Sequence, residues 1–121
     1  MATVTGRVVV ESTGLGIGSV QVLFFNAVGT QVATITTDTC GYFVARVPSN
    51  SVRFHLNPSS LSSAAYYRQY TYGGLRYSAL IGTCTAPLPA LTDGAVTPLP
   101  SGNIFVPATT GPPPPPPNGC T

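Results

Sequence analysis

The first half of the chain alternates apolar and polar residues with the period of two that is typical of β-strands. The alternation predicts five strands, at residues 3–10, 19–25, 31–37, 42–47 and 52–56. In the fifth strand the inward side chains are expected to be Val52, Phe54 and Leu56, and the outward ones Arg53 and His55. No stretch of the chain has a convincing period of 3.6, so the pattern favours an all-β protein.

Turn-forming residues separate these strands at intervals of about 8–12 residues. One such turn ends at Gly41, where Asp38 is expected to bond to its own downstream backbone rather than to a metal. Residues 66–81 are aromatic and predict one or two short strands around a Gly-Gly pair. Four prolines in residues 82–102 predict mostly loop, and residues 103–106 can form a last short strand.

Short strands at regular spacing predict a β-sandwich, which we assign to residues 1–108. Residues 109–121 form a separate arm, because they contain Pro112, Pro113, Pro114, Pro115, Pro116 and Pro117 in an unbroken run. Six prolines favour a left-handed polyproline II rod of ~19 Å. The sequence therefore predicts one all-β domain with a polyproline arm at its C-terminal end.

Four features of residues 6–56 occur together: Gly6-Arg7-Val8 ahead of a glycine-rich loop, Gly18-Ser19-Val20-Gln21-Val22, a strand ending at Thr37-Asp38 with a turn closed by Gly41 and the pair Tyr42-Phe43, and Val47-Pro48 ahead of Val52-Arg53-Phe54. This combination resembles carboxypeptidase regulatory-like domains. The resemblance implies a transthyretin-like, Greek-key β-sandwich of about seven strands. Cys40 departs from the polar residue usual in the family, and residues 57–102 are longer and more aromatic than its usual ending.

The chain carries few charges, with five Lys or Arg and three Asp or Glu in 121 residues. All five basic residues are arginines and they are scattered, which argues against a nucleic-acid partner. The absence of lysine excludes Schiff-base chemistry and a Lys–Asn isopeptide crosslink. Three acidic residues are too few for a calcium or two-metal site, so we expect no cofactor. No apolar stretch approaches the ~18 residues of a membrane span.

The three cysteines are Cys40, Cys84 and Cys120. Their odd number favours one intrachain disulfide, for which Cys40–Cys84 is the natural pairing, with Cys120 left to pair with another chain. The alternative is three unpaired thiols. His55 is the only histidine, and its expected place on an outer face favours a surface residue over a catalytic base.

The segment 66–77 concentrates the residue types that dominate binding interfaces. Its candidate contact residues are Tyr66, Tyr67, Arg68, Tyr70, Tyr72, Arg76 and Tyr77. Tyrosine rings and arginines can contact either a protein or a glycan. The alternative is that alternate tyrosines pack an edge of the sandwich while the rest are solvated.

The proline arm suggests a latch between copies of the chain. A stiff rod loses little entropy on docking, and tyrosine-rich grooves accept such rods. Residues 66–77 of a neighbouring copy could be that groove, with Asn118-Gly119 turning to present Cys120. The alternatives are a linker to a further domain or a disordered end.

These features together predict a non-enzymatic structural protein that self-assembles or decorates a larger array. Residues 1–5 do not resemble a secretory signal, so we expect a virion protein of a bacteriophage, either a capsid decoration (cement) protein or a tail accessory protein. Its partners would be copies of itself or other capsid or tail proteins. The alternatives are a subunit of an extracellular bacterial filament, or a carbohydrate- or protein-binding module of a secreted or surface adhesin.

Overall fold

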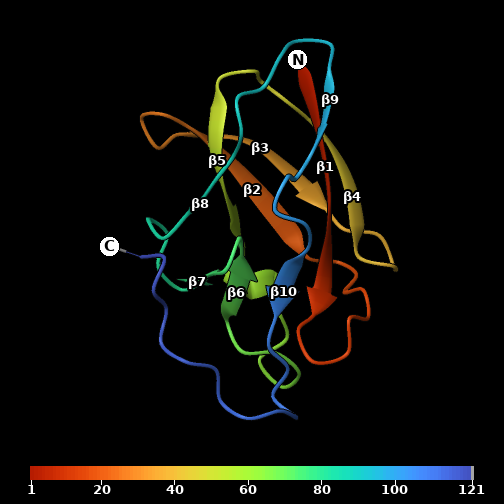
Figure 1. Cartoon of the computed structure of the whole chain (residues 1–121), viewed down its shortest axis with the longest axis vertical. Helices are drawn as coiled ribbons and strands as arrows, with labels where there is room; N and C mark the ends of the chain where they lie inside the picture. The colour runs from red at the N-terminus through yellow and green to blue at the C-terminus, as the bar shows by residue number, and fades with distance from the viewer. Residues whose placement is uncertain (121) are drawn as a thin grey trace.

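The chain folds into two facing β-sheets with loops at both ends (Figure 1). The computed structural model describes residues 1–120. Its strands are β1 (Ala2–Val10), β2 (Gln21–Asn26), β3 (Gln31–Thr36), β4 (Tyr42–Val47), β5 (Ser51–Leu56), β6 (Gln69–Tyr72), β7 (Leu75–Ser78), β8 (Ala86–Pro87), β9 (Val96–Pro98) and β10 (Ile104–Val106). A short 3-10 turn, η1 (Pro58–Ser60), follows β5. The all-β prediction is confirmed.

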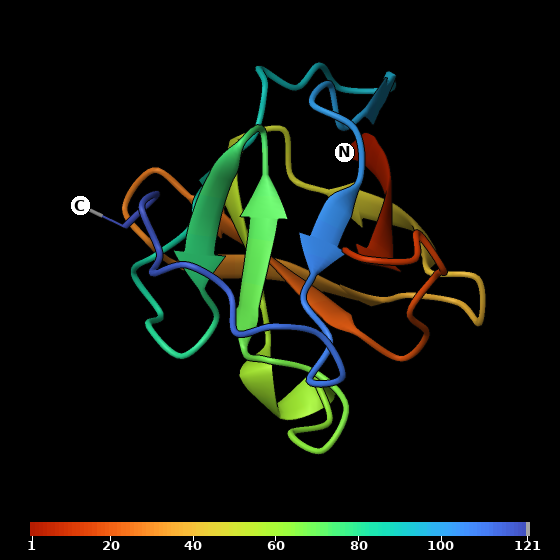
Figure 2. The same cartoon turned by 60° about the horizontal axis from the view of Figure 1, so that its bottom comes forward.

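The larger sheet is built around β1. Its strand order is β4-β1-β10-β6-β7, and β9 pairs with β1 beside this path. β4 pairs with β1 in antiparallel orientation, whereas β9 and β10 run parallel to successive parts of β1. The smaller sheet has the order β3-β2-β5-β8 and packs across the first (Figure 2).

The five strands predicted from the alternation are confirmed as β1 to β5. The aromatic segment forms the β6–β7 hairpin, and residues 104–106 form the predicted last strand. The difference lies in residues 82–102, where β8 and β9 bring the count to ten strands within residues 1–120. Prolines are tolerated at the ends of these two strands, because a residue at a strand end need not donate a backbone hydrogen bond to the neighbouring strand.

The core lies between the inner faces of the two sheets. Its largest fully buried side chains are Tyr70, Phe24, Phe54, Leu56, Leu61 and Ile104. Phe24 of β2 meets Phe43 of β4 edge-to-face, with ring centroids 6.4 Å apart, so this contact joins the two sheets. Gly6 lies opposite Phe43 in the β1–β4 pairing, and the Phe43 ring fills the space above the missing side chain.

Two glycines let the loop after β1 approach the turn between β3 and β4. The Ile17 amide donates to the Val8 carbonyl at 2.9 Å, and the Val8 amide donates to the Gly41 carbonyl at 2.8 Å. Gly41 has a φ of +84°, which an L side chain rarely adopts. The carboxylate of Asp38 accepts from the Cys40 and Tyr42 amides at 2.9 Å, which confirms it as a turn former.

Replacing Gly16 by alanine tests this close approach. A Cβ at position 16 would clash with the backbone carbonyl of Cys40, which no side-chain rotation can relieve. We expect Gly16→Ala to lower the free energy of unfolding in urea by about 1–3 kcal/mol. The matched control is Gly82→Ala, because nothing lies within 4 Å of a Cβ there. Equal stabilities of the two variants would contradict the packing described here.

Candidate functional site

The aromatic segment is divided between the core and the surface. Tyr70, Tyr72 and Tyr77 have exposed fractions of only 0, 4 and 2 %. Residues 70 and 72 share a face of β6, and the hairpin register places Tyr77 opposite Tyr70. These three tyrosines therefore do not form an external contact surface, and the alternative in which alternate tyrosines pack the sandwich describes them correctly.

The three buried tyrosines form one aromatic cluster with β5. Tyr70 and Tyr77 stack with their centroids 5.3 Å apart, and Phe54 meets Tyr72 edge-to-face at 5.1 Å. Burial raises the pKa of Tyr70 and of Tyr77, because a phenolate would lose its water. The cluster fixes the β6–β7 hairpin against the smaller sheet.

The remaining candidates, Tyr66, Tyr67, Arg68 and Arg76, are half-buried. Tyr66 bridges to Ala108, and the Tyr67 amide donates to the Pro107 carbonyl at 3.0 Å. Arg68 donates from Nε to the Pro58 carbonyl at 3.1 Å. Their polar contacts within the chain hold the segments on either side of the hairpin together.

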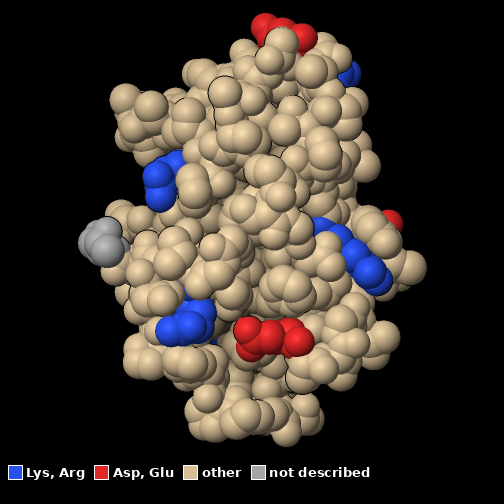
Figure 3. Space-filling model, viewed as in Figure 1, with Lys and Arg blue, Asp and Glu red and all other residues tan. Residues whose placement is uncertain are grey.

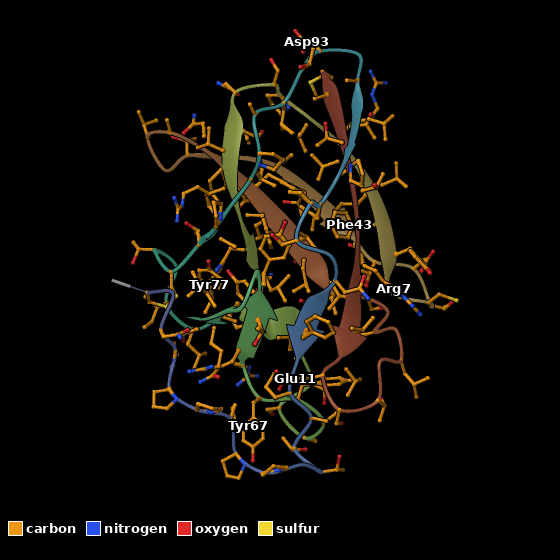
Figure 4. The ribbon with its side chains drawn as sticks, in the orientation of Figure 1. Arg7, Glu11, Phe43, Tyr67, Tyr77 and Asp93 are labelled. Atoms are coloured by element: carbon orange, nitrogen blue, oxygen red, sulfur yellow. A yellow bond between two sulfur atoms is a disulfide. The ribbon has the colours of Figure 1, made fainter. Side chains whose placement is uncertain are left out.

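The C-terminal arm lies against β7 of its own chain. The Arg76 amide donates to Oδ1 of Asn118 at 2.8 Å, and the amides of Asn118 and Gly119 donate back to the Arg76 carbonyl at 3.1 and 2.8 Å. Arg76 also donates from Nε to the Pro116 carbonyl at 3.1 Å. A Cβ on Gly119 would meet the Tyr77 ring at 2.5 Å, so the glycine permits this close contact. Figure 4 shows Tyr77 next to the end of the arm.

The other end of the arm is anchored at Thr109. Its amide donates to the Ala65 carbonyl at 2.9 Å and its hydroxyl to the Ala64 carbonyl at 2.8 Å. Between the anchors, residues 111, 114 and 117 are partly buried, whereas residues 112, 113, 115 and 116 are exposed. Residues 119 and 120, after the second anchor, are both partly buried. The prolines lack an amide proton, so the middle of the arm donates no backbone hydrogen bond.

The disulfide pairing differs from the predicted one. Cys84 pairs with Cys120 within the chain, with their Cα atoms 4.9 Å apart, and Cys40 is free and exposed. Cys40 lies in the turn beside Arg7, whose Nε donates to the Cys40 carbonyl. Cys84 lies beside Ser78, whose amide donates to its Sγ at 3.2 Å. Figure 4 places Arg7 and Tyr77 on opposite sides of the molecule, so Cys40, next to Arg7, lies far from Cys84, next to residues 77 and 78. Cys120 is therefore occupied within its own chain.

His55 is buried, contrary to the surface position that we predicted. Its Nε2 lies 3.1 Å from the Ala79 carbonyl and its Nδ1 lies 2.8 Å from the Tyr70 hydroxyl. A carbonyl only accepts, so in neutral His55 the proton is on Nε2. The Tyr70 hydroxyl has two acceptors for its one proton, Nδ1 of His55 and the Cys84 carbonyl at 3.1 Å. Burial lowers the pKa of His55, although hydrogen bonds to backbone carbonyls oppose this effect. Both ring nitrogens are engaged within the fold.

A shallow groove with a volume of about 270 Å³ lies on the outer side of β1 and β4. Arg7 and Tyr42 are cross-strand partners at one end of it, and the guanidinium carbon lies 4.6 Å from the centre of the Tyr42 ring. Val44 and Pro98 add apolar lining. Strand register alone brings Arg7 to Tyr42, and the sequence pattern did not single out this pair.

Charges are sparse on the surface of the molecule, as Figure 3 shows for one face. Among residues 1–120, no three His, Cys, Asp or Glu side chains gather into a group that could hold a metal ion. Within the same residues there is no helix of the length and apolarity needed to cross a membrane.

In comparisons with known proteins, no protein-family model, no curated protein and no solved structure matches this chain. The resemblance to carboxypeptidase regulatory-like domains therefore remains a prediction from residues 6–56.

The burial of His55 predicts a fall in stability under mildly acidic conditions. Above its usual pKa of 6.5, His55 is neutral in both the folded and the unfolded chain. Below that pH the unfolded chain binds a proton that the folded chain binds more weakly, so the free energy of unfolding decreases. The expected slope is at most about 1.4 kcal/mol per pH unit.

Urea unfolding at pH 7.5, 6.5 and 5.5 measures this slope. The variant His55→Gln keeps a donor and an acceptor at this position but has no group that titrates there. We expect it to be less stable at pH 7.5 and to lose the slope between pH 6.5 and 5.5. If the free energy of unfolding decreased equally with pH in the variant and in the natural chain, His55 would not be the cause of the decrease.

Proposed function

We propose that this chain is a non-enzymatic structural protein whose copies join into a larger array. The observation that carries the proposal is the construction of the C-terminal arm. It has firm anchors at both ends and an intervening proline run that donates no hydrogen bond. An arm built in this way can be exchanged between copies at little cost.

The exchange uses contacts that already exist. The arm of a neighbouring chain can make the same hydrogen bonds to Arg76 and the same disulfide to Cys84. Domain swapping of this kind forms an interface without new kinds of contact, because the docking site of each copy holds the arm of a neighbouring copy in place of its own arm. The arm thereby becomes a latch between copies when Thr109 remains on one body and Asn118 docks on another.

The burial pattern of the arm supports a polyproline II rod in residues 112–117. Up to the end of the proline run the partly buried positions are 111, 114 and 117, three residues apart, and polyproline II has three residues per turn. A rod keeps its shape whether it lies on its own body or spans to the next. We also propose that the strands of the sandwich are connected as in a Greek-key, transthyretin-like fold.

The disulfide is typical of proteins in oxidising surroundings. A virion of a bacteriophage, on which the chain would be a capsid decoration or tail accessory protein, and an extracellular bacterial filament both meet this condition. The low charge of the surface suits an interface, because charged residues are depleted at interface cores.

A second candidate function is a glycan- or protein-binding module of a surface protein, favoured by the groove beside Tyr42. The ring of Tyr42 is half exposed, and Arg7 is held by both the ring and the Cys40 carbonyl. A preformed aromatic and a fixed arginine can stack on a sugar ring and bond to its hydroxyls.

Complementary cysteine variants test arm exchange. One chain carries Cys40→Ser and Cys84→Ser, and the other carries Cys40→Ser and Cys120→Ser. Neither can close its own bridge, but a mixture can join Cys120 of the first chain to Cys84 of the second. We expect the disulfide-linked heterodimer to be the main product of oxidation on a non-reducing gel. We also expect the natural chain to contain linked dimers or larger species that reduction separates.

Two further changes serve as controls. Adding Asn118→Ala to the first chain removes the side-chain bond to the Arg76 amide and leaves the backbone bonds in place. It should reduce the heterodimer several-fold, since docking then precedes oxidation less often. Asn50→Ala changes an exposed asparagine in the turn after β4 and should leave the yield unchanged. A natural chain with the mass of one copy under all conditions, together with no heterodimer, would refute the proposal.

The glycan-binding candidate makes a separate prediction. If the groove binds sugars, a panel of soluble polysaccharides should contain one that binds saturably to the natural chain in calorimetry. Tyr42→Ala should weaken this binding at least about tenfold, since stacking on the ring is lost. Val96→Thr, at an exposed position on β9 outside the groove lining, should leave the binding unchanged. No saturable binding across the panel would eliminate this candidate.

A further inference from the structure

Two open sheets leave five edge strands, and four of them are protected. The β7 edge is covered by residues 118–119 of the arm. β8 has only two residues, one of which is Pro87, and β9 has three residues and ends at Pro98. The pairing of β3 with β2 contains a register shift at Phe24/Phe25. Short strands, prolines, bulges and covering segments are the usual ways in which proteins prevent pairing at sheet edges.

β4 is the fifth edge, and it has none of these features. Its six residues pair with β1 without interruption, and β4 has no other partner strand within residues 1–120. The strand contains no proline, and Arg46 is its only charged residue. Its outward side chains include Tyr42 and Val44, which are 52 and 63 % exposed. Figure 2 shows β4 at the margin of the larger sheet.

The hydrogen-bonding groups of β4 can be assigned to its two sides. The Gly41 carbonyl accepts from Val8 of β1, whereas the amide and carbonyl of Tyr42 both bond to Asp38, away from β1. Amides and carbonyls of alternate residues face the same side of an antiparallel strand. The amides and carbonyls of Val44 and Arg46 therefore face the free edge.

We propose that β4 pairs with β4 of a second copy, in antiparallel orientation about a twofold axis at Ala45. In this register Val44 of each copy lies opposite Arg46 of the other, and the two pairs exchange four backbone hydrogen bonds. The register keeps Tyr42, Val44 and Arg46 of both copies on the outer face of one continuous sheet. The pairing deepens the proposed function, because it names a second contact between copies.

A second copy is the partner that this edge fits. In a twofold contact the same strand must serve as both partners. The register satisfies this requirement, because Val44 of each copy lies opposite Arg46 of the other. The Asp38 turn bonds both backbone groups of Tyr42, so it ends the ladder after these residues and prevents longer stacking. An interface this short is weak, and the dimer should form only at high concentration.

Sedimentation of the full-length chain tests the pairing, with Cys120→Ser added and reductant present so that no arm disulfide contributes. We expect a monomer–dimer equilibrium that becomes visible as the concentration rises to about 1 mM. Val44→Lys places a second charge at the centre of the pairing and should weaken the dimer at least about tenfold. The matched control is Val96→Lys, which adds the same charge at an equally exposed valine on β9 and should leave the equilibrium unchanged.

Hydrogen exchange gives a readout that a change in folding would not mimic. The amides of Val44 and Arg46 should become protected as the concentration rises, whereas that of Phe43, which faces β1, should not change. A monomer at all concentrations, equal effects of the two lysine variants, or no protection at Val44 would each overturn the pairing. Because this experiment excludes the arm disulfide, its failure would leave arm exchange unaffected, and loss of arm exchange would leave the β4 dimer intact.

Discussion

The pairing of β1 along both of its edges is the constraint on which the rest of the structure depends. One edge is bonded to β4, and the other is bonded first to β9 and then to β10. Residues from both ends of the sequence therefore meet on a single strand. Without β1, the β4 strand would lose the one partner strand that it has within residues 1–120, and β10 with the hairpin β6–β7 would be separated from β4 and β9.

Local pattern predicted where the first five strands lie, because a period of two is typical of strands, but in β5 it assigned Val52 to the core and this side chain is exposed. It did not predict the burial of His55, since that position is covered by residues 79–84, which are distant in sequence. The same limit applies to Cys84: its partner depends on where the arm returns, and no spacing rule contains that information. Tyr70, Tyr72 and Tyr77 had the expected alternation, but composition alone could not separate a core cluster from a contact surface.

The two contacts proposed between copies lie at opposite margins of the same sheet. β4 is at one end of the strand order and β7, with its arm, is at the other. A twofold contact at the first margin and an exchanged arm at the second would place sheets side by side in a row. The sparse charge of the chain fits such an arrangement, because few charges would have to be desolvated.

The bridge between Cys84 and Cys120 also determines how the molecule would respond to a pulling force. A load applied at the two ends passes through the bridge, so residues 85–119, with β8, β9 and β10, stay in a closed loop while the rest extends. The oxidised chain would lengthen to about 300 Å, and the reduced one to about 430 Å. The strand at the N-terminal end would be sheared from β9 and β10, which are held within that loop. A subunit of an array under tension would thus yield in its first 84 residues and keep its C-terminal third closed.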